Sequence, residues 1–148
     1  MSDENYMRIA LELAREAETA GEVPVGAVIV TDGEVIGRGR NSPIERSDPT
    51  AHAEILALRE AGAAAGNYRL EGAILYTTLE PCVMCAGALV AARIAKVVFG
   101  ARDLRFGGVR SKFRLADADV LNHRLVVEEG LLGAECAELM LRFFADRR

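Results

Sequence analysis

Residues 73–85 read AILYTTLEPCVMC, and this stretch decides the fold. Its first part, residues 73–79, is rich in apolar and β-branched residues and predicts a buried strand. Pro81 then indicates the start of a helix of about ten residues, because proline is tolerated in a first helical turn. Residues 95–99 predict a further strand, which ends at Gly100. Strand, helix and strand in this order imply a parallel crossover.

The same alternation extends toward both ends of the chain. Residues 25–30 and 34–39 predict two strands, and Asp32-Gly33 between them is typical of a hairpin turn. Residues 41–51 predict a loop, in which Thr50 is a candidate N-cap for the next helix. The other expected elements are helices over residues 5–20, about 52–64 and about 133–146, an irregular stretch over 101–124 and a short strand over 125–127. We therefore expect an α/β fold, with a mixed sheet of about five strands and helices on its faces, in one domain over residues 1–148.

Composition favours a soluble globular protein, and a cytoplasmic location is expected by default. The N-terminus, MSDENY, lacks the basic and then apolar layout of a secretory signal. The most apolar stretch, residues 86–100, contains Arg93 and Lys96, so no membrane partner is expected. Three cysteines are an odd and low number, which argues against a disulfide framework. Cys136 lies among leucines of the last predicted helix, and core packing is expected there.

Charge is distributed unevenly along the chain. The net charge is −4, yet residues 102–114 contain five cationic side chains and only one acidic one, a local balance of +4. The cationic residues are Arg102, Arg105, Arg110, Lys112 and Arg114. Such a segment can steer a polyanion, and the alternative is a solvated surface loop.

Two short motifs carry the chemistry, His52-Ala53-Glu54 and Pro81-Cys82-Val83-Met84-Cys85. Both begin at predicted helix N-termini, where free N–H groups lower the pKa of a thiol. Cys82 and Cys85 are three residues apart and face the same side of a first helical turn. Together with His52 they offer three ligands, which leaves the fourth position of a tetrahedral zinc site to water. This is the arrangement of a catalytic zinc site.

Glu54 completes the expected site as a proton shuttle. On an ideal helix it diverges from His52 by about 200°, so the pair cannot both point at the metal from one face. We expect His52 at the frayed helix start and Glu54 reaching zinc-activated water from the next turn. A Cys-x-x-Cys motif alone is also typical of redox or structural zinc sites. The two motifs in this order match the zinc deaminase signature H-x-E…P-C-x-x-C.

The chain also resembles the bacterial tRNA-specific adenosine deaminases, which convert the wobble adenosine of an arginine tRNA to inosine. The resemblance lies in residues 23–28, Asn41, 48–55, 67–70, 78–88, 98–103, 122–124 and 143–144. It implies a three-layer cytidine-deaminase-like fold, one zinc ion per subunit, a homodimer and an anticodon stem-loop as the partner. The resemblance implies that Asn41 forms a hydrogen bond with adenine and that the Ala53 N–H lies at the reacting position. It also implies that Val28 and Leu79 form walls of the pocket. The residues implied to lie near the RNA are Asp103, Asn122, Phe143 and Phe144.

One segment departs from the family pattern. Residues 107–114 read GGVRSKFR where many members carry a run of small residues. Arg110 is a candidate contact to RNA phosphate there.

Two other functions remain open from the sequence. The first is a deaminase of a free nucleobase or nucleoside of the guanine or cytosine type, and the second is a zinc-stabilised RNA-binding module without turnover.

Overall fold

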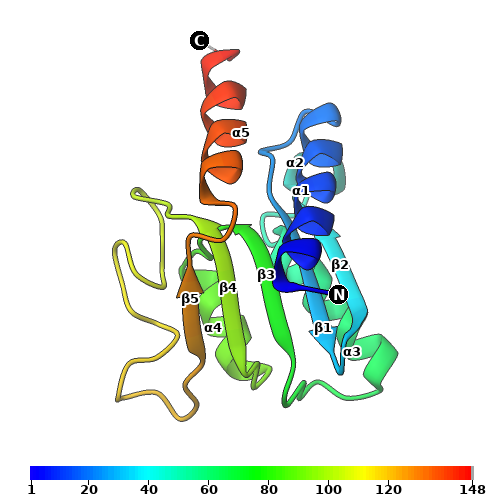
Figure 1. Cartoon of the computed structure of the whole chain (residues 1–148), viewed down its shortest axis with the longest axis vertical. Coiled ribbons are helices and arrows are strands. Elements are labelled where there is room, and N and C mark those ends of the chain that lie inside the picture. Colours follow the sequence, from blue (N-terminus) through cyan, green and yellow to red (C-terminus); the bar gives the residue numbers. More distant parts are fainter. Residues whose placement is uncertain (148) are drawn as a thin grey trace.

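The computed structural model describes residues 1–147 and contains a mixed five-stranded sheet in the order β2-β1-β3-β4-β5 (Figure 1). The strands are β1 (Gly26–Thr31), β2 (Glu34–Arg40), β3 (Ile74–Leu79), β4 (Lys96–Ala101) and β5 (Val126–Glu129). β1 is antiparallel to β2 and β3, whereas β3, β4 and β5 are mutually parallel. β2 and β3 therefore run in the same direction on either side of β1. The predicted mixed sheet and its parallel crossovers are confirmed.

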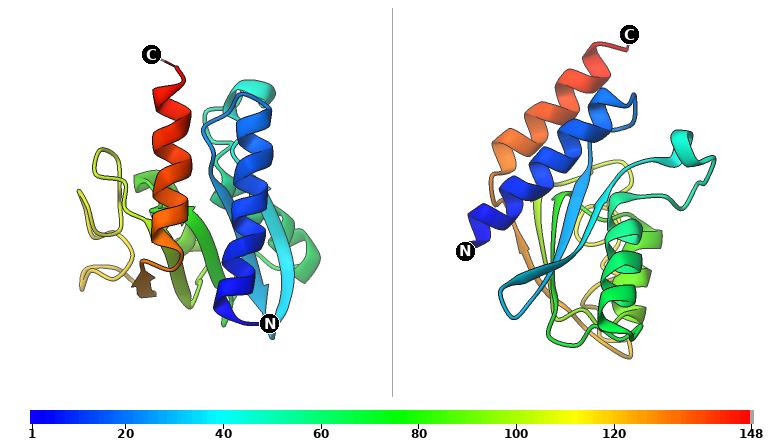
Figure 2. Two further views of the ribbon diagram at one scale, coloured as in Figure 1. Left: turned by 45° about the horizontal axis from the view of Figure 1, so that its top comes forward. Right: turned by 90° about the vertical axis from the view of Figure 1, so that its right-hand side faces the viewer.

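Helices cover both faces of the sheet, as expected. α1 (Asp3–Thr19) and α5 (Gly133–Ala145) lie side by side on one face, and α3 (Ala53–Ala65) and α4 (Val83–Ala91) lie on the other (Figure 2). Ion pairs from Arg8 to Glu135 and from Arg142 to Glu18 join α1 to α5. Among the described residues, no helix is long and apolar enough to cross a membrane.

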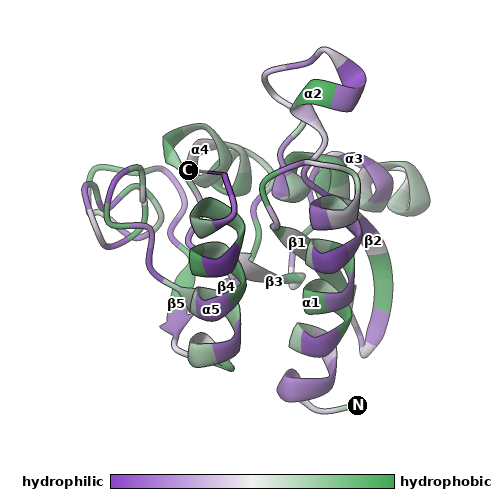
Figure 3. Ribbon diagram, turned by 90° about the horizontal axis from the view of Figure 1, so that it is seen from above, coloured by the Kyte–Doolittle hydropathy of each residue, from purple (hydrophilic) through white to green (hydrophobic). Residues whose placement is uncertain are grey.

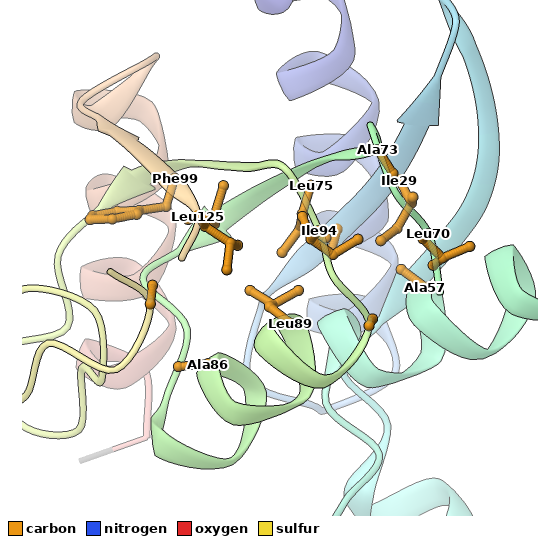
Figure 4. Close-up of a cluster of buried hydrophobic side chains, with 14 of the residues drawn as sticks. Ile29, Ala57, Leu70, Ala73, Leu75, Ala86, Leu89, Ile94, Phe99 and Leu125 are labelled. Atoms are coloured by element: carbon orange, nitrogen blue, oxygen red, sulfur yellow. The ribbon is translucent and has the colours of Figure 1, made fainter. Parts of the chain in front are cut away.

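Strand alternation divides the core into two layers. Side chains of β1 point alternately to the two faces, so Ile29 packs toward α3 and α4 while Val28 packs toward α1. The layer beneath α3 and α4 is built on Leu75, Leu89 and Phe99 (Figure 4). Cys136 is buried in the opposite layer, which confirms its expected core position.

The loop and helix starts differ from the sequence prediction in three places. The predicted loop over 41–51 contains a single helical turn, α2 (Pro43–Arg46). Thr50 does not cap α3, because its hydroxyl donates to Asp48 and His52 occupies the N-cap position. Pro81 precedes α4 rather than opening it, since Cys82 is the N-cap. At Thr50 and Pro81, a local side-chain bond or the extended backbone of the metal motif overrides helix propensity. At residues 43–46, in contrast, Pro43 at the helix start favours a turn that the loop prediction did not include.

Glycine allows β2 to approach the backbone of α3. A Cβ atom at Gly39 would lie 2.1 Å from the carbonyl oxygen of Ala53 and 2.7 Å from the amide nitrogen of Ala57. The facing side of α3 is likewise made of buried alanines. Small residues on both elements thus set the depth at which the first turn of α3 sits.

We expect Gly39→Ala to lower the free energy of unfolding by about 3 kcal/mol, because the added methyl group overlaps helix backbone that cannot move cheaply. Urea denaturation measures this change. Gly62→Ala is the matched control, since its Cβ atom would meet Asn67 at 3.6 Å, an ordinary contact. An equal loss in both variants would contradict the close-approach explanation.

Candidate metal centre and active site

The chemistry-bearing residues meet at one edge of the sheet. β2, β3 and β4 all end there, and α3 and α4 both begin there. His52 and Cys82 are the N-cap residues of the two helices, and both have extended backbone conformations. This edge is where ligands bind in open α/β sheets.

His52, Cys82 and Cys85 are brought together as a metal-binding cluster. Their ligand atoms lie within 4.8 Å of one another. The Nδ1 atom of His52 is 3.5 Å from the sulfur of Cys82 and 3.5 Å from that of Cys85. Tetrahedral zinc with bonds of about 2.1 Å to nitrogen and 2.3 Å to sulfur requires about 3.6 Å between these atoms. The three residues therefore fit a zinc ion without rearrangement.

The two thiols differ in acidity. Hydrogen bonds with Cys85 and, to a smaller extent, with His52 lower the pKa of the Cys82 thiol to about 4, against the opposing effect of burial. The hydrogen bond with Cys82, together with burial, raises the pKa of the Cys85 thiol. One thiolate is thus already favoured beside His52, and a bound metal ion would deprotonate the second thiol.

Glu54 lies beside this cluster and is 4% exposed. Burial raises the pKa of its carboxyl group to about 7, against the opposing effects of a backbone hydrogen bond and of His52. A group with a pKa near neutrality can both take and give a proton. Glu54 stands in the first turn of α3 rather than in the next one. Because His52 is extended and not helical, the divergence expected for an ideal helix does not apply.

A cavity of about 500 Å³ opens onto these groups. Its polar wall includes His52, Glu54, Cys82 and Asn41. The apolar wall consists of Val23, Val25, Leu79, Phe106, Met140 and Phe144. The cavity is therefore an apolar slot with a few polar groups at its base, which is the usual form of a small-molecule or nucleobase site.

The residues predicted to hold the base occupy different positions relative to this cavity. Asn41 lines it, and its Oδ1 accepts a hydrogen bond from the Ala53 N–H at 2.9 Å. Leu79 also lines it, whereas Val28 is fully buried beneath α1 and is not among the lining residues described. The alternation of β1 explains the difference, because Val25 faces the other side of the sheet.

Glu80 is a part of the site that the sequence reasoning missed. It is 2% exposed and directly precedes the Pro81-Cys82 pair. Its carboxylate accepts hydrogen bonds from the N–H groups of Asp103, Val109, Arg110 and Ser111 and from the Ser111 hydroxyl. Burial alone would raise the pKa of Glu80, but these hydrogen bonds outweigh it and lower the pKa. A lone acidic residue at the end of an apolar strand was the available signal.

The cationic segment is partly neutralised by residues outside it. Arg102 pairs with Glu129 at 2.7 Å, and Arg110 makes a two-pronged pair with Asp117 at 2.8 and 3.0 Å. The local balance of +4 counted only residues 102–114 and so overstated the free positive charge. Arg105, Lys112 and Arg114 form no ion pair among the residues the structure describes.

The remaining predicted RNA contacts are dispersed. Asp103 and Phe144 line the cavity, and Phe144 is 50% exposed. Phe143 is buried and packs edge-on against Phe144. Asn122 is exposed in the connection between β4 and β5, outside the cavity lining that the structure describes.

Comparison with known proteins agrees with this geometry. Residues 1–101 match the family model described as the cytidine and deoxycytidylate deaminase zinc-binding region. The chain is 52% identical over 147 residues to a tRNA-specific adenosine deaminase of Haemophilus influenzae, covering 99% of this chain and 85% of that protein.

Two solved structures extend the comparison. One, from a study of A-to-I editing by tRNA:A34 deaminases at the wobble position of transfer RNA, superposes with a TM-score of 0.88 at 47% identity, over 91% of this chain and 98% of the other. The second, a guanine deaminase of Nitrosomonas europaea, gives a TM-score of 0.85 at 28% identity, over 97% of this chain and 85% of the other. The family model covers residues 1–101, which include the three ligand residues and the buried glutamate beside them. This chain therefore belongs to the cytidine and deoxycytidylate deaminase family of zinc-binding enzymes.

Proposed function

We propose that this protein deaminates the wobble adenosine of a tRNA anticodon to inosine, with arginine tRNA as the substrate. The observation that carries the proposal is Glu54, a buried carboxyl group with a pKa near 7 beside a three-ligand metal cluster at the base of a cavity. The names of the relatives support RNA over a free base, since nearly the whole chain matches a tRNA-specific deaminase. A tRNA substrate also argues for a cytoplasmic location.

In this proposal His52, Cys82 and Cys85 hold one zinc ion per subunit. Bound zinc supplies Lewis-acid activation of a water molecule. Glu54 takes one proton from that water and delivers it to a ring nitrogen of adenine, which makes the adjacent ring carbon more electrophilic. The water oxygen adds to that carbon. Glu54 then relays the second proton to the exocyclic amino group, and the carbon–nitrogen bond breaks to release ammonia.

The surrounding residues bind and orient the nucleotide. Asn41 and the Ala53 N–H contact the flipped-out base after their mutual 2.9 Å hydrogen bond opens, and Leu79 packs on the base. Val28 packs beneath α1, so it has no contact with the base in this proposal. Asp103, Asn122 and Phe144 contact the anticodon loop, and the buried Phe143 supports the Phe144 ring from below. Arg110 reaches phosphate by exchanging its bond with Asp117, which is 2.8 Å long in this structure.

One assay distinguishes this function from its rivals. We expect inosine and ammonia from an arginine tRNA anticodon stem-loop with adenosine at the wobble position, and no ammonia from free guanine, cytosine or their nucleosides at equal concentration. Turnover of the free bases alone would indicate a nucleobase deaminase. Stem-loop binding without any product would indicate an RNA-binding module.

Replacing Glu54 tests the proton shuttle. Glu54→Gln keeps the side-chain shape but cannot carry a proton, so turnover should fall by about 10²-fold or more while zinc remains bound. Zinc content per chain and inosine formation are the two measurements. Metal loss in Glu54→Gln, or its near-normal turnover, would contradict the shuttle role.

The same two measurements apply to the cysteines. Cys82→Ala should lose the metal, whereas Cys136→Ala should retain both metal and turnover because Cys136 lies in the core.

We also propose that the protein is a homodimer through α4. Residues 83–91 contain no charged side chain, and Figure 3 shows α4 green to pale along its length while α1 and α5 alternate with purple. Val83, Gly87 and Ala91 are exposed on this helix. A helix that is apolar all round is normally buried. The same apolar chemistry on a second copy would cover it.

A charge on this face should separate the dimer. Gly87 has open space around a built Cβ atom, so Gly87→Glu leaves the subunit fold intact. We expect this variant to be monomeric by light scattering coupled to size exclusion, because an unpaired carboxylate would be buried at the interface. Leu141→Glu, at an exposed position on α5, should remain dimeric. A dimeric Gly87→Glu variant would exclude this interface.

A further inference from the structure

Phe106 is a large apolar side chain that the fold leaves in solvent. It is 62% exposed, and yet it lines the same cavity as His52 and Glu54. Its ring therefore stands at the mouth of the site and not on a remote surface. Neither the metal cluster nor the proton shuttle uses it.

The backbone beneath Phe106 is held firmly. Its N–H and that of Arg105 both donate to Oδ1 of Asp103 at 3.1 Å. The Asp103 N–H in turn donates to Glu80 at 3.0 Å. Gly107, the next residue, forms an isolated β-bridge with Cys82. It also packs closely on Glu80, because a Cβ atom at Gly107 would lie 2.4 Å from the Glu80 carboxylate. The backbone that carries the exposed ring is thus fixed relative to Cys82.

Arg105 adds a positive charge to this aromatic group. Its guanidinium carbon lies 5.2 Å from the centre of the Phe106 ring. Arg105 forms no ion pair within the described part of the chain, and it lines the cavity as well. A planar ring with an adjacent free guanidinium offers one surface for a base and one charge for a phosphate.

We propose that Arg105 and Phe106 form a stacking platform for the nucleobase next to the target adenosine, with Arg105 contacting the phosphate between the two nucleotides. This inference rests on the proposed function and adds a second nucleotide site to it. The apolar slot takes the flipped-out base, and the platform at its mouth takes the neighbour that remains outside. Stacking on an exposed aromatic face tolerates any base, so the platform contributes affinity more than sequence preference.

The test measures binding of the wobble-adenosine stem-loop to zinc-loaded protein in a Glu54→Gln background, where the RNA is not turned over. Phe106→Ala should weaken binding about tenfold, and Phe106→Trp should restore it, because base stacking needs only an aromatic face. Phe113→Ala is the matched control, since Phe113 is a 54% exposed aromatic residue in the same segment that does not line the cavity.

Abasic stem-loops identify the stacked nucleotide. Removing the base on one side of the adenosine should weaken binding to the parent protein but should add little to the loss in Phe106→Ala. Equal stem-loop affinity of the Phe106→Ala and Phe113→Ala variants would overturn the platform. It would also be overturned if removing either neighbouring base weakened binding to Phe106→Ala as much as it weakens binding to the parent protein. A changed oligomeric state in Phe106→Ala would also overturn it by making Phe106 an interface residue.

The two proposals fail in different ways. If the wild-type protein releases no inosine but binding still depends on Phe106 and one neighbouring base, the proposed function is wrong and the platform stands. If wild-type protein makes inosine and the Phe106 variants bind and turn over normally, the proposed function stands and the platform is wrong.

Discussion

Two helices begin at the same edge of one sheet, and the rest of the site depends on that coincidence. The N-cap residues of α3 and α4 are His52 and Cys82, each in an extended conformation that turns its side chain away from the helix axis. The parallel strands β3 and β4 and the glycine-lined approach of β2 to α3 set the distance between these two starts. This backbone packing brings the side chains of His52, Cys82 and Cys85 close enough for the 3.5 Å nitrogen–sulfur distances of the cluster.

A second constraint connects the metal cluster to the surface that faces the substrate. Glu80 lies at the end of β3 and collects hydrogen bonds from both ends of the segment from Asp103 to Ser111. A buried carboxylate is costly unless such donors surround it, so the segment is held by the same group whose neighbours bind the metal. The mouth of the cavity is therefore positioned by Glu80, which lies between the end of β3 and the metal-binding cysteines at the start of α4.

The exposed apolar residues have two different explanations. On α4 they form one continuous helix face with no charge, which suits a second protein subunit. Around the cavity they are single aromatic rings, Phe106 and Phe144, and Arg105 lies beside Phe106, which suits nucleobases and phosphates. The same chain thus presents a flat apolar surface on one helix layer and separate aromatic contacts at the sheet edge.

The sequence by itself determined the metal motif, the order of strands and helices, and the glutamate proposed as the proton shuttle, because each depends on residue type and short spacing. His52, Glu54, Cys82 and Cys85 could be identified in this way. Only the tertiary structure decided which side of β1 faces the cavity, that Glu80 organises a loop more than twenty residues away, and that Arg102 and Arg110 are paired with carboxylates. These features join residues that are distant in sequence, and short-range patterns carry no information about such contacts.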